Sequence, residues 1–216
     1  ILVKKNTFSK YNLKENSKRS YFPVREDIIK EILNLSKEDD IFISTTGKTS
    51  RELYEIREDL GLGQRDFLTI GSMGHSSSIA LGISIIEKER KIFCIDGDGS
   101  MLMHLGSLPI IGSIGPENFI HILLNNCSHE SVGGQPTAAN QINFSMLAKA
   151  IGYVNFFEVS SLKELKDSWN KVYSSKGPTF FLINIKPFSR DNLARPVTSP
   201  KENKKSFMNF LDVASE

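Results

Sequence analysis

From residue 21 onward, short apolar runs alternate with longer stretches in which apolar residues recur at helical spacing. Val24, Ile28 and Ile32 show the helical spacing, which places their side chains on one face of a helix. Pro23 comes just before them, and proline suits the first turn of a helix. The apolar runs have the length of buried strands. We therefore predict strands at residues 40–44, 67–70, 91–95, 119–124, 153–159 and 179–185, and helices at 24–35, 50–60, 76–88, 101–111, 145–151 and 161–173.

This alternation predicts the fold class and the domain organisation. Strands separated by helices are typical of an α/β fold, here a doubly wound, mostly parallel sheet of about six strands with helices on both faces. We assign residues 21–200 to this domain. Residues 201–216 carry a lysine-rich run and then apolar positions at helical spacing, which predicts a C-terminal helix docked on the domain.

The first twenty residues have a different character. The chain begins Ile1-Leu2-Val3 without an initiator methionine, and we interpret residues 1–20 as the end of a preceding domain followed by a basic linker. The linker has Lys10, Lys14, Lys18 and Arg19 against the single acid Glu15. An anion-binding or nucleic-acid-binding arm is the alternative, but no aromatic residues are interleaved to form a stacking surface.

Two polar segments each follow a predicted strand and carry the most informative chemistry. Gly97-Asp98-Gly99-Ser100 follows the strand at 91–95, and Asn125-Asn126 follows the strand at 119–124. Ligands collect at the carboxyl ends of parallel strands, so the two segments should meet at one edge of the sheet. Asp98 and Asn126 offer the oxygen ligands that Mg²⁺ prefers. Gly99 and Ser100 open the next helix, whose free N–H groups favour a phosphate. The segments together predict a magnesium diphosphate site.

Charge and composition exclude several function classes. Lys and Arg total 27 and Asp and Glu total 25 in 216 residues, a net charge of +2, so no global field favours nucleic acid. Cys94 and Cys127 are too few for a disulfide framework and fit a reducing cytoplasm. We find no apolar run of membrane-spanning length and no secretory signal.

The segment Thr46-Gly47-Lys48-Thr49 invites comparison with the Walker phosphate loop. That motif requires a glycine five positions before Gly47, where this chain has Phe42 inside a predicted strand. We therefore reject a Walker loop. The segment still lies between a strand end and a helix start, so its backbone N–H groups can meet a phosphate.

Several blocks together resemble the phosphonopyruvate decarboxylase family of thiamin diphosphate enzymes. They are residues 44–52 (STTGKTSRE), 71–75 (GSMGH), the GDG and NN segments above with the loop that continues to Thr137, and 190–196 (RDNLARP). Four blocks in order are a far more specific signal than an isolated GDG. The resemblance runs from about Tyr21 to the end of the chain and implies a thiamin diphosphate-binding fold, here the C-terminal diphosphate-binding domain.

The resemblance implies cofactors and cofactor-binding residues. Thiamin diphosphate and Mg²⁺ are the expected cofactors. Asp98 and the Asn126 side chain would bind the metal together with the backbone carbonyl of Ser128. Met73 would wedge between the two rings of the cofactor, and the Gly71 carbonyl would accept from its aminopyrimidine. The remaining predicted cofactor contacts are Thr46, Gly47, Ser72, Gly99 and Ser100.

The catalytic residues are less determined by the resemblance. His75 and His129 flank the predicted cleft and could donate a proton or polarise a keto oxygen, although a loop histidine is as often structural. Relatives carry a catalytic glutamate six residues after the metal-binding Asn, where this chain has Val132. That departure leaves His129, Glu130 and Ser131 as candidate proton donors. We read His104, His121 and Cys127 as structural residues.

Three cations are candidates for binding the anionic end of the substrate. Lys48 would face either the diphosphate or the substrate anion, with a solvated side chain as the alternative. Arg190 and Arg195 follow the last predicted strand, and a guanidinium suits a phosphonate or carboxylate. Salt bridging between domains is the equally weighted alternative for both arginines.

The resemblance implies decarboxylation of 3-phosphonopyruvate to phosphonoacetaldehyde and CO₂. It also implies a partner, because an N-terminal pyrimidine-binding domain of the same or a neighbouring chain completes the site in this family. The chain alone should therefore be inactive, and the assembly a homodimer or larger. We expect neither nucleic acid nor a membrane as a partner. The alternatives are the diphosphate-binding subunit of a sulfopyruvate decarboxylase, a nucleotide-binding Rossmann module, which lacks support because no GxGxxG follows a strand, and a regulatory domain without catalysis.

Overall fold

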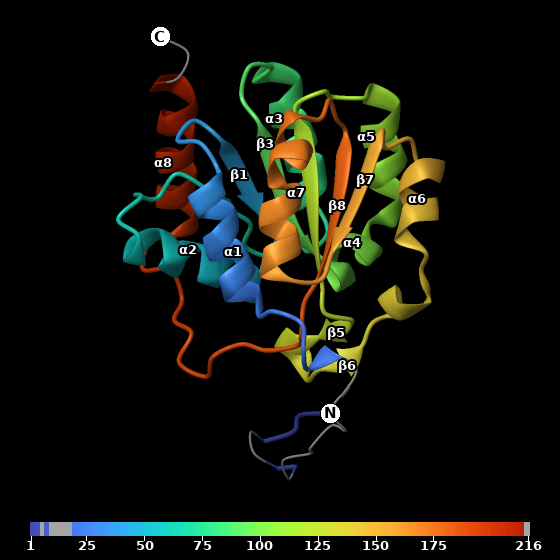
Figure 1. The fold of residues 1–216 in the computed structure, drawn as a ribbon. Coiled ribbons are helices and arrows are strands. Elements are labelled where there is room, and N and C mark those ends of the chain that lie inside the picture. Colours follow the sequence, from blue (N-terminus) through green and yellow to red (C-terminus); the bar gives the residue numbers. More distant parts are fainter. Residues whose placement is uncertain (5–6, 9–18, 214–216) are drawn as a thin grey trace.

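A computed structural model describes residues 1–4, 7–8 and 19–213 of the chain. Lys10, Lys14 and Lys18 of the predicted basic linker lie outside the described residues. The fold is built around one six-stranded sheet in which every pair of neighbouring strands is parallel (Figure 1). The strands, in the order in which they lie across the sheet, are β2 (Phe67–Leu68), β1 (Ile41–Ser44), β3 (Ile92–Gly97), β4 (Phe119–Asn125), β8 (Thr179–Asn184) and β7 (Asn155–Val159).

Helices cover both faces of the sheet and bury two apolar clusters. On one face lie α1 (Arg25–Leu35), α2 (Lys48–Asp59) and α7 (Leu162–Ser174), drawn in front of the sheet in Figure 1. On the other lie α3 (Ser76–Ile86), α5 (Leu108–Ile114), α6 (Phe144–Ala150) and α8 (Pro200–Val213). The central strands β3, β4 and β8 are almost wholly buried, as their uninterrupted apolar runs predict for a parallel sheet covered on both faces. The predicted fold class is confirmed.

The predicted helix at 101–111 is interrupted in the structure. It consists of α4 (Asp98–Met103), a 3-10 turn at Leu105–Ser107, and α5. The break falls at His104, whose φ of −130° is not helical. The helix also starts earlier than we predicted, because Asp98 itself is its first residue. In addition, Pro23 precedes α1 and is not in its first turn.

The last helix includes the lysine-rich run rather than following it. A reciprocal cap begins α8, in which the backbone N–H of Glu202 donates to Ser199 Oγ (3.3 Å) and the Ser199 N–H donates to Glu202 Oε2 (2.7 Å). The helix packs at the β2 edge, where the Asn203 side chain accepts from the Leu68 N–H at 3.1 Å and donates to the Asp66 carbonyl at 3.0 Å. Phe207 of α8 is buried in the apolar cluster on the sheet face that α3, α5 and α6 cover.

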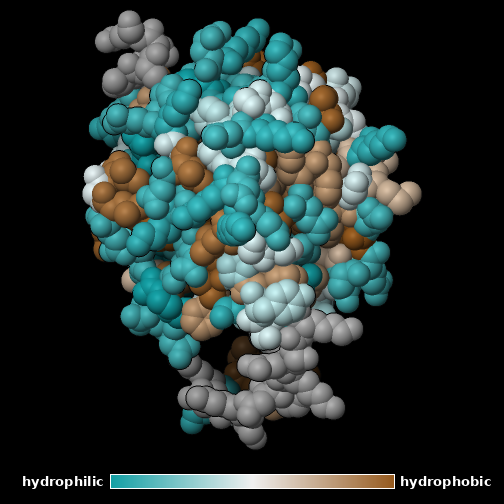
Figure 2. Space-filling view, in the orientation of Figure 1, coloured by the Kyte–Doolittle hydropathy of each residue, from teal (hydrophilic) through white to brown (hydrophobic). Residues whose placement is uncertain are grey.

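A reversal in the strand order next to β1 positions the site. From β1 the chain first adds β2 on one side and then crosses to add β3 on the other. The carboxyl ends of β1 and β3 therefore diverge into helices on opposite faces, which leaves a crevice at this topological switch point. No helix in the described part of the chain is long and apolar enough to span a bilayer. The face shown in Figure 2 is largely hydrophilic, with separate apolar patches.

Candidate active site

A cavity of about 80 Å³ lies at the switch point. At 10–15 Å³ per water, this volume holds roughly five to eight water molecules. The loops after β1, β3 and β4 contribute most of its lining, together with Met73 from the loop after β2. Ten of the predicted site residues line it: Thr46, Lys48, Met73, Asp98, Gly99, Ser100, Asn126, Ser128, His129 and Ser131.

Asp98 is the best-defined polar group of the cavity. Its residue is 2% exposed, its Oδ2 accepts a short hydrogen bond from the Thr137 hydroxyl, and its Oδ1 accepts from the Asn126 N–H at 3.4 Å. Burial raises the pKa of the Asp98 carboxyl, and these hydrogen bonds oppose the effect only in part. No Lys, Arg or His in the described ranges forms an ion pair with it. A buried carboxylate without a cationic side chain is the environment expected of a metal ligand.

The loop after β4 presents Asn126 beside this carboxylate. Cys127 adopts φ +54°, a left-handed conformation that is uncommon for a residue other than glycine. This turn lets the Ser128 N–H donate to Asn126 Oδ1 at 2.9 Å, while Asn126 Nδ2 donates to Glu130 Oε2 at 2.9 Å. The Asn126 side chain is thereby oriented with its oxygen toward the loop. The oxygen keeps a second lone pair with which it can bind a cation.

Backbone donors gather at the first turn of α2. Gly47 is its N-cap with φ +96°, and no side chain caps the helix. The first N–H groups of the helix are consequently available to an anion. Across the cavity, Ser100 fixes the loops in place, because its Oγ lies 2.7 Å from Thr45 Oγ1 and accepts from the Gly74 N–H at 3.0 Å. Ser100 thus connects the turns that follow β1, β2 and β3.

The loop after β2 is held in unusual backbone conformations. Gly71 has φ +71° and Ser72 has φ +43°, and both residues are exposed. Such strain in a residue other than glycine is often found at ligand-binding sites. The turn directs Met73 into the cavity lining, whereas Gly71 and Ser72 lie outside that lining.

The two candidate histidines have different surroundings. His75 is exposed outside the cavity, its Nδ1 lies 3.2 Å from the Ser72 carbonyl, and its ring centroid is 4.0 Å from that of His104. The structure therefore does not bring His75 into the cavity. His129 lines the cavity and packs on Gly99, where a Cβ would lie 3.0 Å from its Nδ1. Ser131 also lines the cavity and is exposed.

A network of charged side chains closes the cavity and was not foreseen from the sequence. Arg25 donates two hydrogen bonds to Glu52, at 2.5 Å and 2.8 Å, and one to Glu130 Oε2 at 3.1 Å. Lys48 Nζ lies 3.3 Å from Glu130 Oε1. Burial would raise the pKa of Glu130, but Arg25 and Lys48 outweigh it and hold this pKa below the usual value. Glu130 is thus a hydrogen-bond acceptor, which disfavours it as the proton donor.

The three predicted anion-binding cations lie in three different places. Lys48 lines the cavity but is shared between Glu130 and a short hydrogen bond to Ser189. Arg190 is paired with Glu26 on α1 at 2.6 Å and with Glu55 on α2. Both of its partners are carboxylates of the same domain, so Arg190 is neutralised in this arrangement and stays a prediction as an anion ligand. Arg195 borders a second cavity.

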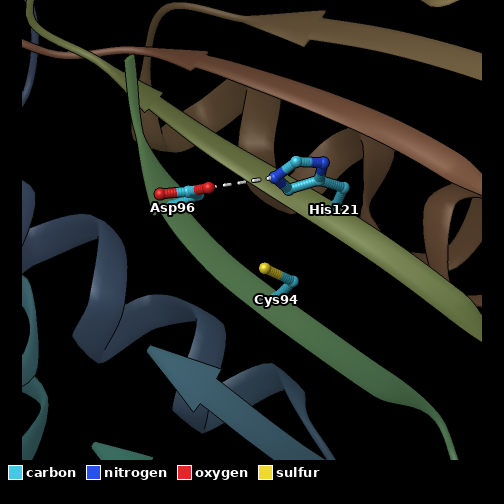
Figure 3. Close-up of side chains that lie close together, drawn as sticks. All are labelled: Cys94, Asp96 and His121. Atoms are coloured by element: carbon cyan, nitrogen blue, oxygen red, sulfur yellow. Dashed lines mark ion pairs between the residues drawn. The ribbon is translucent and has the colours of Figure 1, made fainter. Parts of the chain in front are cut away.

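A polar cluster lies in the sheet beneath the cavity. Figure 3 shows Asp96 and Cys94 on β3 and His121 on β4, with the carboxylate and the imidazole directed toward each other. Asp96 Oδ2 and His121 Nε2 are 3.6 Å apart, both side chains are fully buried, and the Tyr153 hydroxyl lies 2.9 Å from His121 Nδ1. The other Asp96 oxygen accepts from the Gly97 N–H at 2.9 Å. The cluster therefore anchors the turn that presents Asp98.

The arrangement combines three capabilities in one crevice. Asp98 and Asn126 offer oxygen ligands, the amino end of α2 offers free N–H donors, and Met73 offers an apolar contact. A phosphorylated cofactor with a divalent cation needs the first two, and a cofactor with a bent ring system needs the third. The residues present therefore fit magnesium and thiamin diphosphate.

Comparisons with known proteins agree with this chemistry. The family described as thiamine pyrophosphate enzyme, C-terminal TPP binding domain, matches residues 48–183. Phosphonopyruvate decarboxylase of Streptomyces viridochromogenes is 35% identical over 189 residues, which is 88% of this chain and 46% of that protein. Sulfopyruvate decarboxylase subunit beta of Methanocaldococcus jannaschii is 34% identical over 169 residues, which is 78% of this chain and 87% of that subunit.

A solved structure shares the fold. It is that of a putative thiamin diphosphate-dependent enzyme from Mycobacterium smegmatis, with a TM-score of 0.63 and 16% identity over 78% of this chain and 32% of that one. The chain spans about half the length of the phosphonopyruvate decarboxylases it matches and most of the sulfopyruvate decarboxylase beta subunits. These matches exclude the Rossmann dinucleotide alternative. The chain belongs to the thiamine pyrophosphate enzymes, whose C-terminal TPP binding domain it contains.

Proposed function

We propose that this chain is the cofactor-binding part of a decarboxylase that requires thiamin diphosphate and magnesium and acts on a 2-oxo acid with a second acidic group. The substrate we infer is 3-phosphonopyruvate, and the products are phosphonoacetaldehyde and CO₂. The observation that carries the proposal is the buried Asp98 carboxylate, which accepts from the Asn126 N–H at the switch point and forms no ion pair with any described residue. The phosphonopyruvate decarboxylase relatives support the substrate.

Each part of the cavity has a distinct task in this proposal. Asp98, the Asn126 side chain and the Ser128 carbonyl would hold Mg²⁺, and Thr46, Gly47, Gly99 and Ser100 would hold the diphosphate. Met73 would support the rings, with Gly71 and Ser72 forming the turn beside it. When bound, thiamin diphosphate supplies the electron sink for loss of CO₂.

The proton donor is proposed among the predicted residues that line the cavity. His129 lines the cavity and is fixed against Gly99, so we propose it as the proton donor, with Ser131 beside it. His75 lies outside the cavity of this chain. It can act only if a partner domain or loop movement brings the substrate to it. Glu130 keeps Lys48 and Asn126 in position through its hydrogen bonds and ion pairs.

A partner domain is part of the proposal. Apolar side chains on the segments that follow β2, β3 and β4 leave much of their surface exposed, at 61% for Ile70 and Met103 and 71% for Val132. Exposed apolar surface of this kind marks protein interfaces. The relatives named sulfopyruvate decarboxylase subunit beta imply a further subunit in those proteins. We propose that a pyrimidine-binding domain, in the same or another chain, covers these residues in a dimer or larger assembly. Two buried free thiols fit a cytoplasmic location.

The second candidate substrate is sulfopyruvate. The chain covers 87% and 97% of two sulfopyruvate decarboxylase beta subunits, so its length matches that of a separate subunit. The two candidates share the 2-oxo acid and differ in the terminal anion.

The test is decarboxylation by this chain combined with its pyrimidine-binding partner. CO₂ release from phosphonopyruvate and from sulfopyruvate is measured with thiamin diphosphate and Mg²⁺, and then with EDTA. We expect activity only with both cofactors and the partner, and higher kcat/KM for the phosphonate. Higher kcat/KM for sulfopyruvate would transfer the proposal to the second candidate. Full activity of Asp98→Ala would contradict the cofactor assignment itself.

A further inference from the structure

A second, larger cavity lies next to the site. Its volume is about 260 Å³, and the first turn of α2, the end of β2 and residues 195–203 line it. Thr46 lines both cavities, so a ligand in one lies beside a ligand in the other. The volume suits a small organic acid and exceeds what a single ion needs.

The charged residues that line this second cavity are all cationic. Arg51 and Arg195 both border it, and no Asp or Glu does. Within the described ranges, neither guanidinium has a carboxylate within ion-pair distance. By contrast, Arg25, Lys48 and Arg190 are all neutralised by glutamates. The second cavity therefore has two positive charges without a carboxylate partner among the described residues, whereas Arg25, Lys48 and Arg190 are balanced.

One residue that lines this cavity, Thr69, has a buried hydroxyl without a partner among the described residues. Thr69 is 4% exposed and lines the cavity, and its Oγ1 has no hydrogen-bond partner among the described residues. A buried hydroxyl normally finds a partner, so an orphaned one indicates a ligand or a water. The uncapped amino end of α2 at Gly47 adds a favourable dipole for an anion.

We propose that Arg51, Arg195 and Thr69 form the subsite for the phosphonate or sulfonate group of the substrate. The inference rests on the proposed function and extends it, because it separates the substrate anion from the diphosphate. Each guanidinium can donate two parallel hydrogen bonds to an oxyanion, and the Thr69 hydroxyl can donate one more. Two uncompensated cations match a dianion better than a monoanion. The subsite therefore favours a phosphonate over a sulfonate of the same shape.

Direct binding of small anions tests the subsite without catalysis. The probes are methylphosphonate and methanesulfonate at slightly alkaline pH, added to the chain without thiamin diphosphate or Mg²⁺ and followed by calorimetry. We expect the phosphonate to bind more tightly, and Arg51→Gln or Arg195→Gln to weaken it at least about tenfold, the scale of one charge-assisted bond. Lys176→Ala is the matched control, because it removes an exposed cation that pairs with Glu117 at 3.0 Å. Equal weakening by Lys176→Ala, or no binding to the wild type, would overturn the inference.

Two further measurements keep the outcomes separable. Thr69→Val has nearly the same shape as the wild type and should weaken the phosphonate while leaving the circular dichroism spectrum and Tm intact, which separates subsite loss from misfolding. In the assembled enzyme, Arg195→Gln should raise KM for the preferred acid and leave KM for pyruvate, which lacks the anion, unchanged. An equal rise for pyruvate would overturn the subsite alone. Loss of magnesium-dependent cofactor binding by the wild type would instead contradict the proposed function.

Discussion

Replacing Asp98 by Asn should stabilise the free protein and abolish cofactor binding at the same time. Asp98 is 2% exposed, its carboxylate forms no ion pair within the described part of the chain, and it accepts hydrogen bonds from the Thr137 hydroxyl and the Asn126 N–H. An asparagine keeps both contacts, because its oxygen can accept from Asn126 and its NH₂ can donate to the Thr137 hydroxyl oxygen. The substitution therefore removes a buried charge, and only the Thr137 O–H loses its acceptor.

The substitution should raise the stability of the ligand-free protein and remove the stabilisation that the cofactors provide. Removing the charge of the buried Asp98 carboxylate should raise the free energy of unfolding by about 1–3 kcal/mol. Each kcal/mol moves Tm by about 2–4 °C in a protein of this size. The Asp98→Asn variant should thus melt roughly 2–12 °C higher without ligand. Magnesium and thiamin diphosphate at a hundredfold excess over their Kd should stabilise the wild type by about 2.7 kcal/mol. The variant should lose this gain.

Differential scanning calorimetry with and without the two cofactors measures both effects. Asp167→Asn is the matched control, because it makes the same chemical change at an exposed position of α7. It should leave both melting temperatures within about 1 °C, as is usual for surface substitutions. A variant that melts lower than the wild type without ligand, yet keeps the full cofactor-induced shift, would refute the assignment of Asp98 as a metal ligand.

Three other predictions follow from local contacts. Gly99→Ala places a methyl group 3.0 Å from the His129 ring. We expect kcat to fall about tenfold or more because the ring is displaced, while Tm changes by only a few degrees. An unchanged kcat would argue against His129 as the proton donor. Gly112→Ala brings a Cβ within 1.9 Å of a backbone carbonyl in the turn after α6, which should cost roughly 3 kcal/mol or more in chemical denaturation; near-normal stability would contradict that close packing. Burial raises the pKa of Tyr153 and of Tyr173, so both stay neutral in the folded state above pH ~10, where tyrosines of the unfolded chain ionise. The stability that these two side chains contribute is complete below that pH and is lost as the pH rises further. In an alkaline titration, phenolate absorbance should therefore reach the value for all five tyrosines only when the chain unfolds, and full ionisation of a folded chain would refute this.

The fold was predictable because its determinants are local. Each central strand is a continuous apolar run, and each crossover helix has a single apolar face, so periodicity alone specified the order of elements. The errors fell where a local backbone choice overrides the pattern. The break at His104 is an example, since the apolar spacing of residues 101–111 continues through it.

For the candidate site, the residues at strand ends were predictable and the charge pairs between distant segments were not. Residues adjacent to strand ends, such as Asp98 and Asn126, could be placed because topology brings those ends together. The network of Arg25, Glu52 and Glu130 joins residues 27 and 105 positions apart, and no periodic signal links them. The pairing of Arg190 with carboxylates on α1 and α2 has the same cause. Charge pairs between distant segments depend on packing, which the sequence pattern leaves open.

The distribution of these pairs is itself informative. Around the first cavity, Arg25 and Lys48 are occupied by Glu52 and Glu130, so neither of them competes with a metal for the Asp98 carboxylate. No Asp or Glu of the described residues lines the second cavity, so Arg51 keeps its charge for an anion. The two cavities share Thr46 and therefore offer adjacent sites of opposite preference. A metal-bound diphosphate and an acidic substrate would require such a separation, because uncompensated cations in the first cavity would disfavour the metal.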